Sequence, residues 1–141
     1  MLYQATRAIH AYLSRTTMLN VYTEEKEKYS AVCLDWTMEY GSQYVIRFIS
    51  GDDKDDVSVR VTELLNVQEP DRAALLPVIN GLNNRFPYVK FTLDQNGRVN
   101  VSYDYLEPTV HPANSAEEII THLTRTIDEA YPELMHALWG G

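Results

Sequence analysis

Residues 80–105 read NGLNNRFPYVKFTLDQNGRVNVSYDY, and this stretch decides the fold. It consists of the end of a helix, a proline stop and two runs in which apolar and polar residues alternate. Alternation with a period of two places one set of side chains on a core face and the other in solvent, so each run predicts a strand. Gln95, Asn96 and Gly97 separate the two runs. The stretch therefore predicts a β-hairpin.

The register of this hairpin follows from its two faces. A two-residue turn would mix apolar and polar side chains on each face. A three-residue loop instead sets Leu93 opposite Val99 and Phe91 opposite Val101, which keeps the faces separate. Such a loop needs a left-handed residue, as in a G1 bulge. We therefore predict that Gly97 has a positive φ.

The segment before the hairpin predicts an amphipathic helix. Apolar residues recur there at helical spacing, at Leu75, Ile79, Leu82 and Phe86. Pro87 ends this helix because a proline disfavours helical geometry at the residue before it. Pro77 must lie in or near the first turn, or else kink the helix. Gly81 costs about 1 kcal/mol relative to alanine, and we expect a close approach to a sheet or to a second helix to offset that cost.

The rest of the chain adds two helices and three strands. Residues 3–15 predict a short amphipathic helix. Period-two alternation predicts a three-stranded antiparallel meander over residues 32–38, 44–49 and 57–61. Ser115, with Glu118 three residues later, predicts the capping box of a last helix whose apolar stripe continues to Leu138. Pro132 interrupts that stripe, so we expect a kink or a second short helix there.

The element order is thus helix, three strands, helix, two strands, helix. It predicts an α+β fold in which helices pack on one face of an antiparallel sheet of about five strands, in the order α-β-β-β-α-β-β-α. The length of 141 residues favours a single domain over residues 1–141. The apolar content of 45% is typical of a globular protein.

The charge balance disfavours two classes of partner. Twenty acidic residues against twelve basic ones give a net charge of −8. That charge argues against nucleic acid and against an anionic membrane surface. The one cysteine, Cys33, cannot form an intramolecular disulfide, which fits a reducing compartment. Since the sequence also predicts neither a membrane span nor a signal peptide, we expect a soluble, cytoplasmic protein.

The candidate chemical groups do not combine into a recognisable centre. The acidic segment 52–56 lacks the spacing of a calcium loop, and a solvated turn is the favoured interpretation. Zinc-ligand spacing is absent among the four histidines, His10, His111, His122 and His136. Cys33 lies in the middle of a strand without a neighbouring histidine, and we expect a small buried residue. We therefore predict a non-enzymatic protein without a metal or a cofactor.

The order of elements over residues 5–138 resembles the fold of type III secretion chaperones. The helix–hairpin stretch is similar to the YbjN-like family at Asn80, Leu82, Asn83, Phe91 and the run VNVSYD at residues 99–104. Members of that bacterial family are described as regulators of sensory transduction and are not known as enzymes. The resemblance implies a non-catalytic, chaperone-like or regulatory domain. It also implies a homodimer, since chains with the type III chaperone order commonly pair.

The residues on the second sheet face predict an interface. Val45 and Ile49 alternate with core positions, and three helices can cover only one face of a sheet. Tyrosine and tryptophan are enriched at binding hot spots. We therefore predict a protein partner or a homodimer, with an interface at Val45, Arg47, Ile49, Tyr103, Tyr105 and Trp139. Three alternatives stay open: residues 16–29 could fold back over this face, a concave sheet could hold a small ligand, and an active site could be assembled from distant residues.

Overall fold

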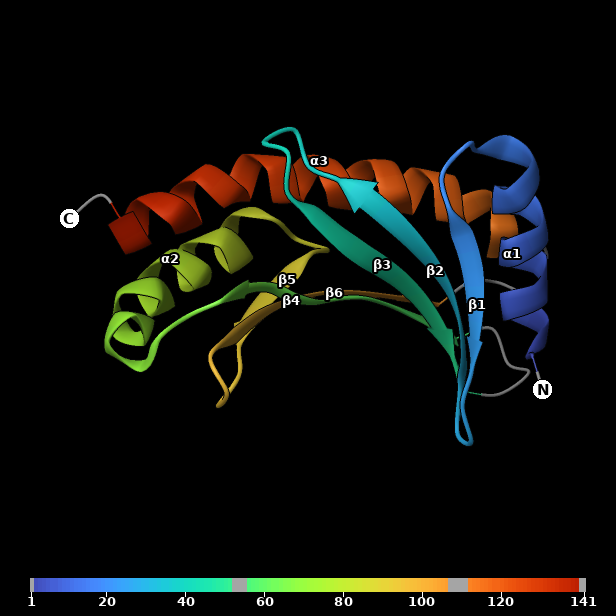
Figure 1. Cartoon of the computed structure of the whole chain (residues 1–141), viewed down its shortest axis with the longest axis horizontal. Helices are drawn as coiled ribbons and strands as arrows, with labels where there is room; N and C mark the ends of the chain where they lie inside the picture. Colours follow the sequence, from blue (N-terminus) through green and yellow to red (C-terminus); the bar gives the residue numbers. More distant parts are fainter. Residues whose placement is uncertain (1, 52–55, 107–111, 140–141) are drawn as a thin grey trace.

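Six antiparallel strands form one curved sheet in the order β1-β2-β3-β4-β6-β5, and helices lie on one of its faces (Figure 1). The computed structural model describes residues 2–51, 56–106 and 112–139. The strands are β1 (Val21–Glu25), β2 (Ser30–Thr37), β3 (Gln43–Ser50), β4 (Asp56–Asn66), β5 (Lys90–Leu93) and β6 (Arg98–Leu106). The helices are α1 (Gln4–Thr16), α2 (Arg72–Arg85), which follows the 3-10 turn η1 (Glu69–Asp71), and α3 (Pro112–Trp139). The predicted α+β class is confirmed, with one strand more than expected.

The additional strand is β1, which lies in the segment that the sequence left open. It pairs with β2 in antiparallel register, with Val21 opposite Leu34 and Thr23 opposite Val32. The segment therefore extends the sheet at its edge. The alternative in which residues 16–29 fold back over the second face is wrong, because the backbone groups of β1 are used for pairing within the sheet.

The predicted hairpin register is confirmed. Leu93 pairs with Val99, Phe91 pairs with Val101, and Gly97 has a φ of +85°. Gly97 is also buried. Its carbonyl oxygen accepts a hydrogen bond of 2.7 Å from the N–H of Val67. A Cβ atom at Gly97 would lie 2.4 Å from the carbonyl oxygen of Val67. The hairpin loop is thus packed against the connection between β4 and α2.

Asn83 attaches α2 to the edge of the sheet. Its amide nitrogen donates to the carbonyl oxygen of Phe91 at 2.8 Å, and its amide oxygen accepts from the N–H of Phe91 at 2.7 Å. These are the two backbone groups that a further strand would use beside β5. Asn83 therefore closes the outer edge of β5 at Phe91.

Several expectations about the helices need correction. Gly81 makes no close approach, because a Cβ atom placed there would meet nothing within 4 Å. Pro77 lies in the second turn of α2 rather than the first. The last helix begins at Pro112, so Ser115 lies inside it instead of capping it. Pro132 does not start a second helix, since α3 continues through it to Trp139. Packing against the sheet and the other helices holds α3 together despite the missing N–H of the proline.

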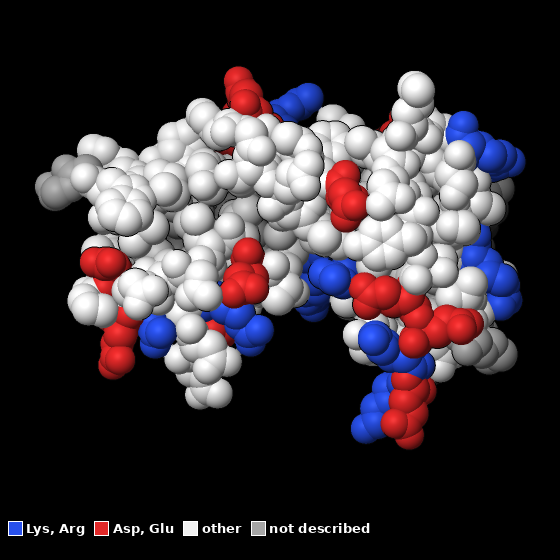
Figure 2. All heavy atoms as spheres, viewed as in Figure 1, with Lys and Arg blue, Asp and Glu red and all other residues white. Residues whose placement is uncertain are grey.

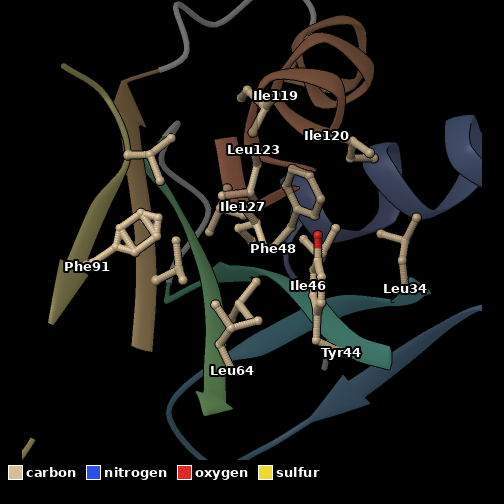
Figure 3. Packing of buried hydrophobic residues seen from close by; sticks show 14 of the residues in the cluster. Leu34, Tyr44, Ile46, Phe48, Leu64, Phe91, Ile119, Ile120, Leu123 and Ile127 are labelled. Carbon is tan, nitrogen blue, oxygen red and sulfur yellow. The ribbon is translucent and has the colours of Figure 1, made fainter. Parts of the chain in front are cut away.

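The core lies between the sheet and the helices. Ile46 and Phe48 of β3 are at most 1% exposed, and Figure 3 shows them facing Leu123 and Ile127 of α3. The core cluster continues with Phe91 and the apolar residues of β6 at one end and with α1 at the other. This packing fixes α3 along the sheet and leaves one flank of the helix facing solvent.

A bulge bends β4. Thr62, Glu63 and Leu64 stand opposite the single residue Asn100 of β6. Glu63 has a φ of +60°, and its N–H donates to the side-chain oxygen of Asn100 at 2.8 Å. Bulges bend a strand and increase its local twist. The bend accords with the strong curvature of the sheet in Figure 1.

Candidate functional site

A continuous groove follows one flank of α3 and has three compartments. The central compartment has a volume of about 850 Å³, the compartment beside α2 about 600 Å³ and the compartment beside α1 about 360 Å³. Trp36 and Thr121 line both the central and the α1 compartments. Arg85, Pro132 and Glu133 line both the central and the α2 compartments. Figure 2 shows a recessed surface between α2 and the β2–β3 turn, with acidic and basic side chains beside it.

The spacing of residues on α3 explains the floor of the groove. Thr121, Arg125, Asp128 and Pro132 line the central compartment and recur three or four residues apart, so they share one flank of the helix. This flank lies beside the buried stripe that packs on the sheet. Pro132 has no N–H and cannot donate the usual helical hydrogen bond to Asp128, four residues earlier. The floor therefore combines charged side chains with the apolar ring of Pro132.

Aromatic residues line the wall opposite α3. The β2–β3 turn carries Tyr40, which is 55% exposed and stacks on Tyr131 of α3 with a ring-centroid distance of 5.8 Å and an interplanar angle of 26°. Trp36, near the end of β2, is half-buried and lines the same compartment. Gly41 has a φ of +95°, a conformation that favours glycine and shapes this turn. The end of β2 and the following turn thus each place one aromatic ring at the groove.

The central compartment has an excess of negative charge. Four carboxylates, of Glu39, Asp128, Glu129 and Glu133, line it together with two guanidinium groups, of Arg85 and Arg125. Arg85 binds both carboxylate oxygens of Glu133, at 3.2 and 2.6 Å. Within residues 2–51, 56–106 and 112–139, no lysine or arginine forms an ion pair with the other three carboxylates. Their charge is therefore available to a ligand.

The helix-free face of the sheet is organised differently. One carboxylate oxygen of Glu24 accepts from Nε of Arg47 at 3.0 Å and from Sγ of Cys33 at 3.1 Å. Nearby, Arg60 forms an ion pair with Asp104. Burial, together with the hydrogen bond to Glu24, raises the pKa of the Cys33 thiol to about 12. Because the thiolate is the nucleophilic form, this cysteine is unreactive at neutral pH.

Sequence reasoning missed the cluster of Glu24, Cys33 and Arg47. Glu24 lies in the run of residues 23–28, which was interpreted as a solvated charge run, and its proximity to Cys33 depends on β1 pairing with β2. Its hydrogen bonds to Cys33 and Arg47 correct that interpretation for Glu24. The prediction that Cys33 is a small buried residue is confirmed, since the side chain is 0% exposed.

The structure places half of the predicted interface on the helix-free face. Val45, Arg47 and Ile49 alternate with the buried residues of β3, and each is half-buried. Figure 2 shows the lower side of the molecule hollowed between two lobes, with charged side chains at its margin. In the strand register Val45 lies opposite Asp35, whereas Ile49 lies opposite Ala31 and Ser58.

The other predicted interface residues lie elsewhere. Tyr103 is on the helix-covered face, where its ring centroid lies 6.1 Å from that of Tyr88 and 5.9 Å from that of His122. Trp139 is 77% exposed near the end of α3. The side chain of Tyr105 is outside the described residues. The structure therefore does not gather the predicted residues into one surface.

Two further features of the described residues concern metal ions and membranes. In the described ranges, no three histidine, cysteine or acidic side chains are grouped so that they could hold a metal ion. Residues 52–55 of the acidic segment and His111 are outside those ranges. No described helix combines the length and the apolar character needed to cross a membrane.

A one-sided α+β sheet with an open groove beside its longest helix defines a binding domain of the chaperone-like type. Residues 33–141 match the family described as T3SS (YopN, CesT) and YbjN peptide-binding chaperone 1, and the chain belongs to this family. The predicted YbjN-like and type III chaperone-like character is thereby confirmed. The match begins within β2, so α1 and β1 precede it.

A solved structure supports the same fold. The crystal structure of YbjN from E. coli, described as a candidate transcription regulator, is similar with a TM-score of 0.56 and 14% sequence identity, over 87% of this chain and 88% of that chain. At this identity the likeness concerns the fold alone. A comparison with curated proteins found no match.

Proposed function

We propose that this chain is a non-enzymatic, cytoplasmic bacterial domain that binds a short segment of a partner protein in the groove along α3. The continuous groove with exposed aromatic walls carries the proposal. From Thr121 to Pro132 the groove follows twelve residues of helix, whose ends are about 16 Å apart at a rise of 1.5 Å per residue. An extended peptide of about five residues spans that length at roughly 3.3 Å per residue.

Two further observations support a binding role over catalysis. The family is described as peptide-binding, which accords with a groove of peptide dimensions. The cysteine, a potential nucleophile, is buried and has a raised pKa, so it is a poor candidate for covalent chemistry. The groove offers aromatic surface and unpaired carboxylates, which suit recognition of a flexible chain.

The proposal is tested by blocking the groove. Thr121 is exposed and lines two compartments, so Thr121→Arg places a long side chain in the groove without burying it. Thr62→Arg is the matched control, an exposed threonine on the helix-free face. Peptides selected from a display library should bind Thr62→Arg with the affinity of the unmodified chain. They should bind Thr121→Arg at least about tenfold more weakly, which corresponds to a loss of about 1.4 kcal/mol in binding free energy.

The two tryptophans provide a direct readout. Trp36 lines the groove, and Trp139 lies near the end of α3. In a Trp139→Phe background, peptide binding should change the emission of Trp36. Equal weakening by Thr121→Arg and Thr62→Arg, with both variants folded by circular dichroism, would contradict binding in the groove.

Self-association through the helix-free face is the second candidate. Val45 and Ile49 are half-buried apolar side chains on that face. A specific dimer would bury about 1,200–2,000 Å² in total. Light scattering at micromolar concentration should then give twice the formula mass, and Val45→Glu should return it to the monomer value. A monomeric mass for the unmodified chain would exclude this interface at that concentration.

A further inference from the structure

We propose that the central compartment of the groove selects peptides that place an arginine or lysine side chain between the β2–β3 turn and α3. This inference rests on the peptide binding proposed above, and it adds the chemical class of the segment. Three properties of the compartment carry it: its uncompensated charge, its aromatic wall and its free acceptors.

The charge of the compartment favours a cation. Glu39, Asp128 and Glu129 have no ion-pair partner within the described residues, whereas Arg85 is held by Glu133. Arg125 reduces the negative potential because it lies one helical turn before Asp128 and Glu129. Four carboxylates still outnumber two guanidinium groups. A basic side chain gains from this potential, and an acidic one would be repelled.

The aromatic wall suits the same ligand. Cations bind over the faces of tryptophan and tyrosine rings, at about 6 Å or less from the ring centroid. Trp36 and Tyr40 both line the compartment beside the acidic residues. Stacking on Tyr131 holds the Tyr40 ring in place before any ligand arrives. A guanidinium group could therefore stack on a ring and reach a carboxylate at the same time.

The floor supplies acceptors that match a donor-rich side chain. Among the described residues, the carboxylate of Asp128 accepts one long hydrogen bond of 3.4 Å, from the N–H of Glu39. The carboxylates of Glu39 and Glu129 line the same compartment. Guanidinium carries five donors and ammonium three, and neither accepts. Acceptors gathered without matching donors thus complement arginine or lysine.

The experiment uses the full chain and a randomised display library of short peptides. Selected sequences should be enriched in arginine or lysine next to apolar residues. One selected peptide is then synthesised with arginine and with citrulline, which has nearly the same shape without the charge. The citrulline peptide should bind about tenfold more weakly, the loss expected for a charge-assisted contact.

Charge-neutralising variants locate the effect. The triple variant Glu39→Gln, Asp128→Asn and Glu129→Gln should bind the arginine and citrulline peptides with similar affinity. The matched control replaces three exposed acids that line none of these compartments, Glu27, Glu69 and Asp71, with the corresponding amides and should keep the tenfold preference. This control removes the same total charge, so it separates local recognition from the overall field of the protein.

The outcomes distinguish this inference from the proposed function. If Thr121→Arg blocks binding but the arginine and citrulline peptides bind equally, the groove binds peptides and the basic preference is wrong. The inference is also wrong if both triple variants lose the preference alike. If no peptide is selected, or if Thr121→Arg leaves binding unchanged, both the proposed function and this inference are overturned.

Discussion

The two sides of the sheet deal with charge in opposite ways. On the helix-free face, Arg47 binds Glu24 and Arg60 binds Asp104. In the groove on the helix side, Glu133 pairs with Arg85, but Glu39, Asp128 and Glu129 have no ion-pair partner among the described residues. One face satisfies its charged groups internally, while the other leaves them beside exposed aromatic rings.

This difference indicates which side is prepared for a ligand. Charged groups that already pair within the chain must lose those contacts before they can bind something else. Unpaired carboxylates at a solvent-filled groove require no such exchange. The comparison therefore favours the groove as the binding surface, although the sheet face contains the half-buried apolar residues Val45 and Ile49.

The largest expected effect on stability comes from substituting the glycines in two turns, one beside the helix-free face of the sheet and one beside the groove. Gly97 closes the hairpin that forms one lobe around the helix-free hollow, and Gly41 shapes the turn that carries Tyr40 to the groove. Both have a positive φ. Gly97→Ala should cost about 3–5 kcal/mol, because left-handed strain combines with a clash against the backbone of Val67. Urea unfolding measures the loss.

Gly41→Ala is the control for that substitution. It adds the same methyl group in the same backbone region, but a Cβ atom there meets nothing within 4 Å. The cost should be only the strain, about 1–2 kcal/mol. Equal losses at the two glycines would mean that the hairpin loop can move away from Val67.

These glycines also show what the sequence could predict. The left-handed Gly97 followed from face matching, a rule that uses only residues close in the chain. The packing of Gly97 against Val67 could not be predicted in this way. That contact joins the β5–β6 loop to the connection between β4 and α2, and their proximity depends on the whole sheet. The predicted hairpin was therefore right in register, but the contact of its loop with Val67 was not predicted.

The groove lay beyond such local reasoning. The apolar stripe of the last helix predicted which flank packs on the sheet, but the flank with Thr121, Asp128 and Pro132 has ordinary surface residues. This flank becomes one side of a groove only because Tyr40 and Trp36 lie opposite it, and these residues are more than eighty positions earlier in the chain. Pro132 was interpreted as a kink or the start of a second helix, and not as a residue of a groove. Tyr103 and Tyr105 were the tyrosines predicted at an interface, and Tyr40 was not among them.

The next effect in size comes from removing one ion pair on the helix-free face and one beside the groove. Arg47 and Glu24 have side chains that are 30% and 22% exposed, whereas Arg85 and Glu133 are 50% and 47% exposed. Arg47→Met should cost about 1–2 kcal/mol, because the half-buried Glu24 loses its charged donor. Arg85→Met should cost less than about 1 kcal/mol, as exposed pairs contribute little.

Salt provides the matching control for these ion pairs. High ionic strength should reduce the cost of Arg85→Met more than that of Arg47→Met, since exposed charges are screened more strongly. Urea unfolding at low and high sodium chloride gives both values. A larger cost for Arg85→Met at low salt would reverse the comparison and make the bridge between α2 and α3 the stronger contact.

The smallest effect concerns a hydroxyl below the groove. Tyr44 is 6% exposed, and its hydroxyl has no hydrogen-bond partner among the described residues. Figure 3 shows this hydroxyl directed toward α3. Burial raises the pKa of Tyr44, and the nearby charge of Asp128 adds to the shift, so the phenol stays neutral at physiological pH. Tyr44→Phe should therefore leave stability unchanged or raise it by up to about 1 kcal/mol, because an unpaired buried hydroxyl is removed.

Tyr12→Phe is the contrasting variant, since the Tyr12 hydroxyl donates to Glu117 at 2.7 Å and connects α1 to α3. It should lower stability slightly, because this hydrogen bond is lost. A clear loss of stability in Tyr44→Phe would show that the hydroxyl has a bound water or another partner, and the groove floor would then be more polar than its side chains indicate.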